Sequence, residues 1–71
     1  MTIEKIKDNI KSNINKVLYF KINGSRNQIE EFKGIITSAY KSIFLIKIKD
    51  TDIIKSFSYT DILIGNLEIL S

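Results

Sequence analysis

The sequence contains no cysteine and no histidine among its 71 residues. Without cysteine no disulfide can stabilise the chain, so stability must come from packing, aided by self-association where the core is too thin. Structural zinc sites use cysteine and histidine as ligands, so none is expected here. The commonest general base and the thiol nucleophile are missing as well. We therefore expect a protein that is not an enzyme and uses no cofactor.

Long apolar runs are also absent. No run approaches the roughly 20 residues that span a bilayer, and the first seven residues mix isoleucine with charged side chains and lack a signal-peptide core. These features predict a cytoplasmic protein that makes no membrane contact. The length predicts one domain over residues 1–71, with a small core.

Positive charge is concentrated in the first part of the chain. Residues 1–49 contain ten Lys and Arg against four Asp and Glu, a net charge of +6. Residues 50–71 contain one lysine against four carboxylates, a net charge of −3. A basic segment attracts phosphates or acidic protein surfaces. The alternative interpretation is that the lysines only keep the strand faces solvated.

The N-terminal segment has the periodicity of a helix. Isoleucines recur at positions 3, 6, 10 and 14 and form one stripe on a helical surface. Thr2 is a suitable N-cap, and Glu4 lies in the first turn, where a carboxylate is favourable. We predict a helix over residues 2–14. A helix this short is marginal in water, so its isoleucines must dock on another surface.

From residue 16 the period changes to two. Residues 16–70 predict five strands, at about 16–22, 28–37, 42–49, 54–59 and 67–70, with a helical turn at 60–63. Asn23-Gly24 predicts a hairpin, and Gly34 predicts a bend or bulge in the second strand. The predicted fold is mainly β: a small five-stranded SH3-like or Sm-like barrel preceded by one N-terminal α-helix.

The third predicted strand has an apolar start on its outward side. If Phe44 and Ile46 point inward, then Ile43 and Leu45 point outward. We expect the N-terminal helix to cover these two residues, with a second subunit as the alternative. Self-association through an exposed edge strand or through the helix is a further expectation.

The candidate binding face combines basic residues with tyrosines. Small barrels bind nucleic acid through basic grooves and aromatic faces on which bases stack. Tyr19 alternates with Lys21 on the first strand; the alternative is that Tyr19 packs against the helix or the barrel rim. Arg26, beside Ser25, is suited to clamp a phosphate or carboxylate, or else it only occupies a hairpin tip. The candidate residues are Lys16, Tyr19, Lys21, Ser25, Arg26, Tyr40, Lys41, Lys47 and Lys49, with Lys33 as a further lysine.

Two pairs of carboxylates occur in the chain. Glu30 and Glu31 are neighbours on a predicted strand and therefore point to opposite faces, so they cannot share a site. Asp50 and Asp52 lie in a predicted turn, where carboxylates cap backbone amides; a cation site is the alternative. No metal site is predicted from either pair.

Several separated motifs carry a family resemblance. They are Asn23-Gly24-Ser25-Arg26, Gly34-Ile35, Ala39-Tyr40, Ser42-Ile43-Phe44 and the segment 56–63. With these motifs the chain, from about residue 3 to residue 69, resembles the Veg family, short proteins of low-G+C Gram-positive bacteria. The resemblance implies an SH3-like or Sm-like barrel behind an N-terminal helix. It also implies a non-enzymatic regulatory role linked to biofilm formation and matrix-gene control. The family's hairpin often carries further basic residues, whereas Asn27 and Gln28 follow Arg26 here.

Together these features predict a small non-enzymatic regulatory protein that acts by binding a protein partner. The alternative is a nucleic-acid-binding barrel that uses a basic face, with weak binding and no readout of bases. A continuous positive groove beside Tyr19 or Tyr40 would favour nucleic acid. Dispersed charge beside an apolar edge would favour protein.

Overall fold

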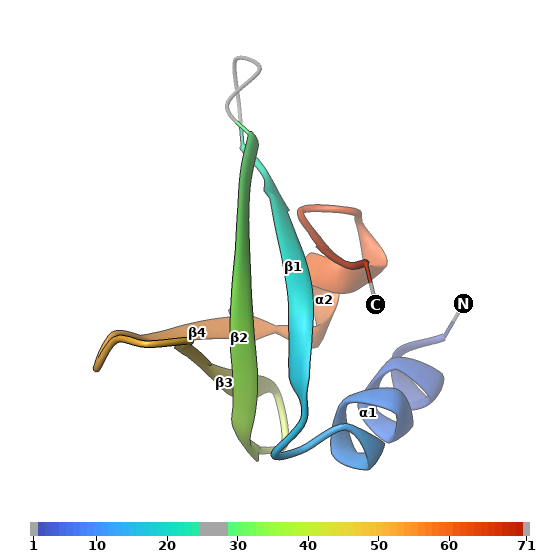
Figure 1. The fold of residues 1–71 in the computed structure, drawn as a ribbon. Helices are drawn as coiled ribbons and strands as arrows, with labels where there is room; N and C mark the ends of the chain where they lie inside the picture. Colours follow the sequence, from blue (N-terminus) through green and yellow to red (C-terminus); the bar gives the residue numbers. More distant parts are fainter. Residues whose placement is uncertain (1, 25–28, 71) are drawn as a thin grey trace.

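The computed structural model describes residues 2–24 and 29–70. Along the chain (Figure 1) the elements are α1 (Ile3–Ser12), β1 (Val17–Asn23), β2 (Ile29–Ala39), β3 (Ile43–Ile48), β4 (Ile54–Ser58), α2 (Tyr59–Leu63) and β5 (Leu67–Ile69). The predicted mainly β fold with one N-terminal helix is confirmed. In the described ranges no helix is long and apolar enough to cross a membrane.

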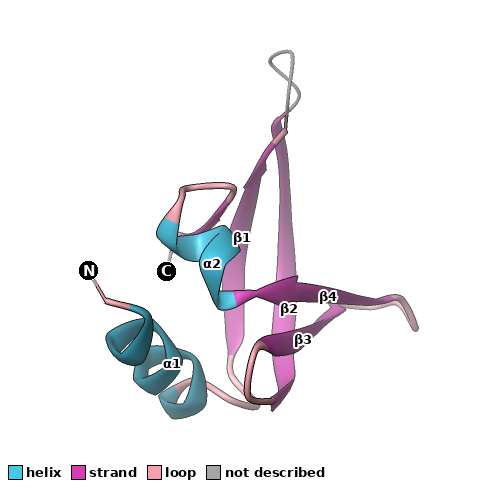
Figure 2. Cartoon of the chain, turned by 180° about the vertical axis from the view of Figure 1, so that it is seen from behind, coloured by secondary structure: helices cyan, strands magenta, loops and turns pink. Residues whose placement is uncertain are grey.

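The strands form one antiparallel sheet in the order β4-β3-β2-β1-β5. The long strand β2 pairs with β1 along its first part and with β3 along its second part. β3 and β4 therefore run across the β1–β2 hairpin and fold the sheet over its inner face (Figures 1 and 2). Within the described residues β4 and β5 do not pair, so the sheet is open and the word barrel describes it only approximately.

The helix α1 begins where its cap was predicted and ends earlier. Thr2 is the N-cap, and its hydroxyl accepts a hydrogen bond from the backbone N–H of Lys5 at 3.3 Å. Asn15 adopts a φ of +69°, and its N–H donates to the carbonyl of Ile36 at 2.8 Å. This bond to β2 turns the chain into β1, which is why the helix ends at Ser12 rather than at residue 14.

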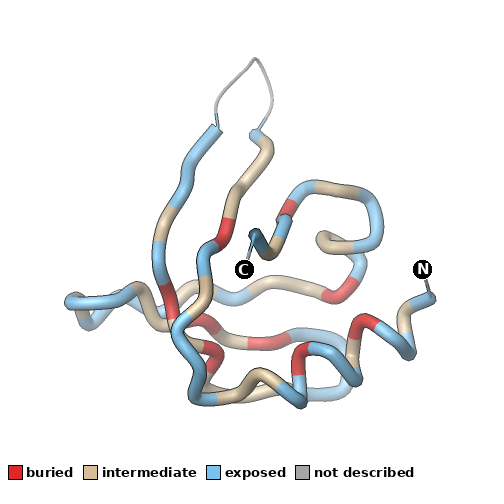
Figure 3. The backbone as a smooth tube through the Cα atoms, turned by 45° about the vertical axis from the view of Figure 1, so that its right-hand side comes forward, coloured by how far each residue is buried: buried red, intermediate tan, exposed pale blue. Residues whose placement is uncertain are grey.

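The core lies between the inner face of the sheet and α1 (Figure 3). Its buried members are Ile6, Ile10, Phe20, Ile36, Phe44, Ile46, Tyr59 and Leu67. The helix thus docks on the same side as Phe44 and Ile46, and the prediction that it covers Ile43 and Leu45 is wrong. An open sheet cannot cover its own inner face. The helix therefore buries most apolar surface by filling that opening.

Gly34 has a packing role, whereas the predicted bulge lies further along β2. The register with β3 shifts between Ile36 and Ser38, and Gly34 itself pairs regularly with residues of both β1 and β3. A Cβ on Gly34 would lie 2.5 Å from Cγ2 of Ile46 and 3.1 Å from the carbonyl oxygen of Lys47. Glycine is therefore needed because side chains of β3 pack directly over the β2 backbone.

Tyr59, predicted in the fourth strand, is instead the first residue of α2. Ser58 and Asp61 form a capping box, in which each side chain accepts from the other residue's backbone N–H, and this ends β4 one residue early. The Tyr59 ring packs 5.5 Å from the ring of Phe44. Its hydroxyl donates to the carbonyl of Tyr40 at 2.6 Å. Burial raises the pKa of the Tyr59 phenol above its usual value.

Candidate functional site on the outer face of the sheet

The face of the sheet opposite the core carries most of the candidate binding residues. Side chains alternate along each strand, and residues paired across strands share a face. This surface, the outer face, therefore contains Val17, Tyr19, Lys21, Glu31, Lys33, Ile35, Ile43, Leu45, Lys47, Ile54, Ser56 and Glu68. Both helices pack on the other side against the core, which leaves the outer face open to a partner.

Three apolar residues and one lysine cross the outer face in a single row. Val17 pairs with Ile35, Ile35 with Lys47, and Lys47 with Ile54. The end residues Val17 and Ile54 are 50% and 57% exposed. We call these four residues the apolar row. Val17 and Ile35 are neighbours in this row, and Lys47 separates them from Ile54. Exposed apolar side chains gathered on one face of a sheet are typical of a binding surface.

A basic and aromatic row lies beside the apolar row. Tyr19 pairs with Lys33, whose Nζ lies 5.3 Å from the centroid of the tyrosine ring. The backbone N–H of Lys49 donates to the carbonyl of Lys33 at 2.9 Å, so Lys49 follows in the same direction. Tyr19 is 42% exposed and lies on the face away from α1. The structure therefore joins Tyr19, Lys33 and Lys49 beside Lys47 of the apolar row.

Lys21 lies in a different electrostatic setting. It pairs with Glu31 on one side and with Glu68 on the other, so the charges alternate across three strands. Opposite charges at paired positions attract, and two carboxylates outnumber the single ammonium. This arrangement weakens the case for Lys21 as a phosphate ligand. The pairing with Glu68 could not be predicted from the sequence, because Glu68 is 47 residues further along the chain.

The remaining candidate residues lie elsewhere. Tyr40 and Lys41 occupy the turn between β2 and β3, where Tyr40 is 54% exposed and its carbonyl accepts from Tyr59. Lys41 lines a shallow pocket of about 160 Å³ beside Lys7. Lys16 is exposed in the connection before β1. Ser25 and Arg26 lie outside the described residues, so the predicted anion clamp stays a prediction.

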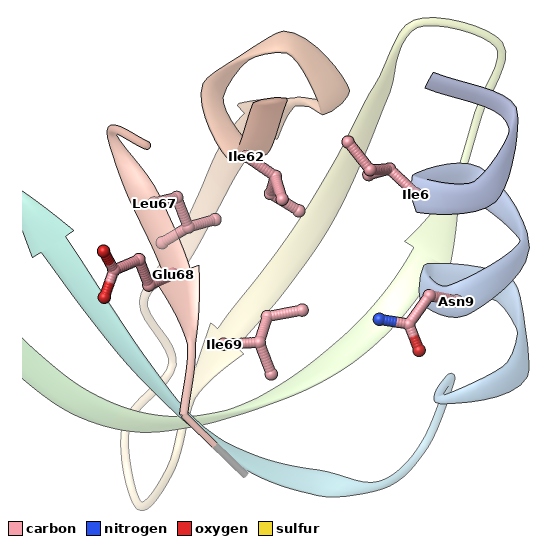
Figure 4. Close-up of a pocket in the computed structure, with 6 residues that line it drawn as sticks. All are labelled: Ile6, Asn9, Ile62, Leu67, Glu68 and Ile69. Atoms are coloured by element: carbon pink, nitrogen blue, oxygen red, sulfur yellow. The ribbon is translucent and has the colours of Figure 1, made fainter. Parts of the chain in front are cut away.

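A second feature is an apolar pocket of about 320 Å³ between α1, α2 and β5 (Figure 4). Figure 4 shows its lining, which is Ile6, Asn9, Ile62, Leu67, Glu68 and Ile69. The amide of Asn9 is its polar side-chain group, because the carboxylate of Glu68 points away from the pocket (Figure 4), and no nucleophile or acid–base pair of the described residues lies in it. The pocket suits an apolar side chain. It arises from long-range packing, so no local signal in the sequence pointed to it.

Sequence reasoning also missed the second role of Asn23. It was interpreted as a turn residue, and β1 does end there and pair in a hairpin with β2. In addition, its side-chain amide donates to the carbonyl of Gly65 at 2.8 Å, and its N–H donates to the carbonyl of Asn66 at 2.8 Å. Asn23 therefore ties β1 to the loop before β5. The turn at Asp50 and Asp52 also differs from prediction, because the hydroxyl of Thr51 accepts from the N–H of Ile53 at 3.1 Å.

The charge of the outer face is uneven. Lys33, Lys47 and Lys49 lie together beside Tyr19, whereas Lys21 alternates with Glu31 and Glu68. The family model described as biofilm formation stimulator VEG matches residues 1–70, essentially the whole chain. No curated protein matches the chain.

Proposed function

Because the chain belongs to the Veg family of biofilm formation stimulators, we propose that it is a non-enzymatic regulator of biofilm formation that binds a protein partner through its outer face. The family supports the regulatory role. The observation that carries the proposed mode of action is the uncovered apolar row, with Val17 and Ile54 at least half exposed. We also propose the cytoplasm as its location, which cell fractionation tests.

The chemistry of the outer face indicates the chemistry of its partner. Apolar side chains supply most of the free energy when they are buried in an interface, and charged groups around them mainly set specificity and association rate. Lys47 lies within the apolar row, and Lys33 and Lys49 adjoin it. The matching surface therefore has apolar side chains surrounded by carboxylates.

Biofilm mass is the readout that tests this proposal. Cells whose only copy carries both Val17→Thr and Ile43→Thr should form less biofilm, because these two exposed outer-face residues lose apolar surface while keeping β-branched side chains. The matched control is Leu63→Thr with Ile64→Thr, since these residues at the end of α2 are 44% and 62% exposed. If both double variants support wild-type biofilm at equal protein levels, the outer face is not the binding surface.

A second candidate function is nucleic-acid binding, favoured by the cation–π contact between the Lys33 ammonium and the Tyr19 ring. An exposed tyrosine flanked by lysines is a platform for a base with its phosphates. Titration with single- and double-stranded DNA and RNA at two salt concentrations tests it. Lys33→Glu with Lys47→Glu should abolish binding. Lys5→Glu with Lys11→Glu, two exposed lysines of α1, is the control that makes the same total charge change. The absence of any affinity at low salt excludes this candidate.

A further inference from the structure

The edge strand β4 has free backbone groups on one side. The N–H of Ile48 donates to the carbonyl of Ile53 at 2.9 Å. In an antiparallel pair every second residue directs both backbone groups to the neighbouring strand, and the residues between them direct theirs away. Ile54 and Ser56 therefore face away from β3. Both are exposed, and no backbone group of residues 2–24 and 29–70 bonds to their outward N–H and C=O groups.

The opposite edge of the sheet is not available in this way. The N–H of Leu70 donates to the carbonyl of Tyr19 at 2.8 Å, so Leu67 and Ile69 are the residues of β5 that face away from β1. Leu67 is 0% exposed, so a partner strand cannot reach its backbone. The two edges of the open sheet thus differ, and only β4 offers two consecutive outward residues to a partner.

A groove adjoins the free edge of β4. It has a volume of about 390 Å³ and lies between β4, the start of α2 and the end of β1. Ile22, Phe57 and Leu67 form its apolar part, and polar groups of Asn23 and Asp61 are among those that border it. In Figure 2 the β1–β2 hairpin rises beyond this edge of β4. Because residues paired across strands share a face, a residue opposite Phe57 on an added strand would direct its side chain toward this groove.

Lys55 sets the charge preference of the edge. Its side chain lies on the inner face, with Nζ 3.8 Å from Oε2 of Glu30 and 5.8 Å from the centroid of the Phe32 ring. The ammonium has three donors and the Lys55 side chain is 38% exposed, so a further carboxylate can approach it. A strand residue opposite Lys55 is therefore favoured to be acidic.

The same lysine argues against a second copy of this chain at the β4 edge. Two β4 strands paired antiparallel use all the outward groups of Ile54 and Ser56 only when Ile54 of one copy is opposite Ser56 of the other. That register places Lys55 directly opposite Lys55. Like charges at paired positions are destabilising, so this edge suits a different chain.

We propose that the free edge of β4 binds an extended segment of a partner protein as a sixth strand. A carboxylate of the segment lies opposite Lys55, and an apolar side chain lies opposite Phe57 in the groove. The inference rests on the proposed function and specifies the partner's chemistry. Strand addition of this kind takes affinity from main-chain hydrogen bonds and specificity from alternate side chains.

The test uses the full chain labelled with nitrogen-15 and two peptides, acetyl-Thr-Ile-Thr-Glu-Val-Thr-amide and the same sequence reversed, to cover both strand directions. One of them should shift the amide signals of Ile54 and Ser56 and slow their hydrogen exchange. The amide of Ile69, which lies on the opposite edge of the sheet and does not line the groove, should be unaffected. Replacing the peptide glutamate by lysine should weaken binding about three- to tenfold.

Variants of Lys55 provide the charge test. Lys55→Gln should remove most of the discrimination between the glutamate and lysine peptides, and Lys55→Glu should reverse it. Lys41→Gln, an exposed lysine in the β2–β3 turn, is the control and should bind as wild type. Intact amide spectra of the free variants show that each one is folded.

Three results would overturn the inference. They are no amide shift at Ile54 and Ser56 up to millimolar peptide, no dependence on the sign of the charge, and protection of these amides that rises with protein concentration alone. The last would assign the edge to a second copy. The variant with Val17→Thr and Ile43→Thr keeps the β4 edge and should bind the peptide. If the wild type fails to bind either peptide while cells with that variant form less biofilm, the sixth strand is rejected and the proposed function still stands.

Discussion

The two faces of the sheet are made from the same strands and similar residues, yet they have different roles. On β3, Ile46 is 0% exposed on the inner face, whereas Ile43 is 41% exposed on the outer face. Residue type does not distinguish them. Their position relative to the curl of the sheet does, because curling and the docking of α1 enclose one face only. Apolar residues on the enclosed face stabilise the fold, and those on the other face remain available for a partner.

The largest expected effect comes from placing a charge on each face in turn. Ile10→Asp should remove about 4 kcal/mol or more from the free energy of unfolding, because it buries an unpaired carboxylate at a residue that is 1% exposed. That is comparable to the total stability of roughly 4–10 kcal/mol for a chain of this size. Val17→Asp on the outer face should cost less than about 1 kcal/mol. Chemical denaturation measures both, and similar losses would contradict the division into two faces.

A smaller effect is expected where the inner face is tightest. Gly34→Ala should cost about 1–3 kcal/mol, because the new Cβ overlaps the Ile46 side chain. Gly65→Ala is the contrast: its Cβ would meet no atom within 4 Å, and the cost of about 1 kcal/mol comes from its φ of +84°. Adding Ile46→Leu should recover part of the stability that Gly34→Ala loses, and none of the stability that Gly65→Ala loses. Equal behaviour of the two glycines would show that contact with β3 is not the cause.

The buried phenol of Tyr59 gives a pH-dependent test of the inner face. Tyr59→Phe should lose about 1–2 kcal/mol at neutral pH, because the carbonyl of Tyr40 loses its donor. The pKa of Tyr59 is raised in the folded protein, so its contribution is complete below the unfolded pKa of about 10 and is lost as pH rises through the folded pKa. The wild type should therefore lose stability above about pH 10 faster than the variant does. Parallel pH profiles would contradict this.

The smallest effect is expected on the outer face. Lys21→Gln should cost about 0.5 kcal/mol at low salt, because Glu31 and Glu68 then face each other without a cation between them. The loss should vanish near 1 M salt, where charges are screened. Lys47→Gln, which pairs with Ile35 and Ile54, should show no such salt dependence. A matching salt dependence in the two variants would show that the charge row across β1 has no energetic role.

Much of the fold followed from local patterns. The stripe of isoleucines predicted α1, and alternation predicted the strands, because both periods are properties of the backbone. The end of β4 was placed one residue late, although Ser58 and Asp61 have the spacing of a capping box. The bulge of β2 was assigned to Gly34, because a glycine required by close packing and one required by backbone conformation look alike in a sequence.

The candidate site was predicted less completely than the fold. The outward positions of Tyr19, Lys21 and Lys47 followed from strand alternation, but their neighbours depended on register. Register paired Lys33 with Tyr19 and set Lys21 between two glutamates. It also separated Tyr40 and Lys41 from the outer face. None of these relations has a local signal, since each joins residues from different strands.

The sequence by itself determined the elements of this protein and which side chains share a face, because helical and strand periods are local. Its lack of cysteine and histidine also means that the chain has no disulfide, no thiol nucleophile and no imidazole base. The tertiary structure decided which face α1 covers and that β4 and not β5 keeps a reachable edge. Those outcomes depend on how an open sheet curls and on which apolar surfaces it can bury, and both are set by contacts between distant residues.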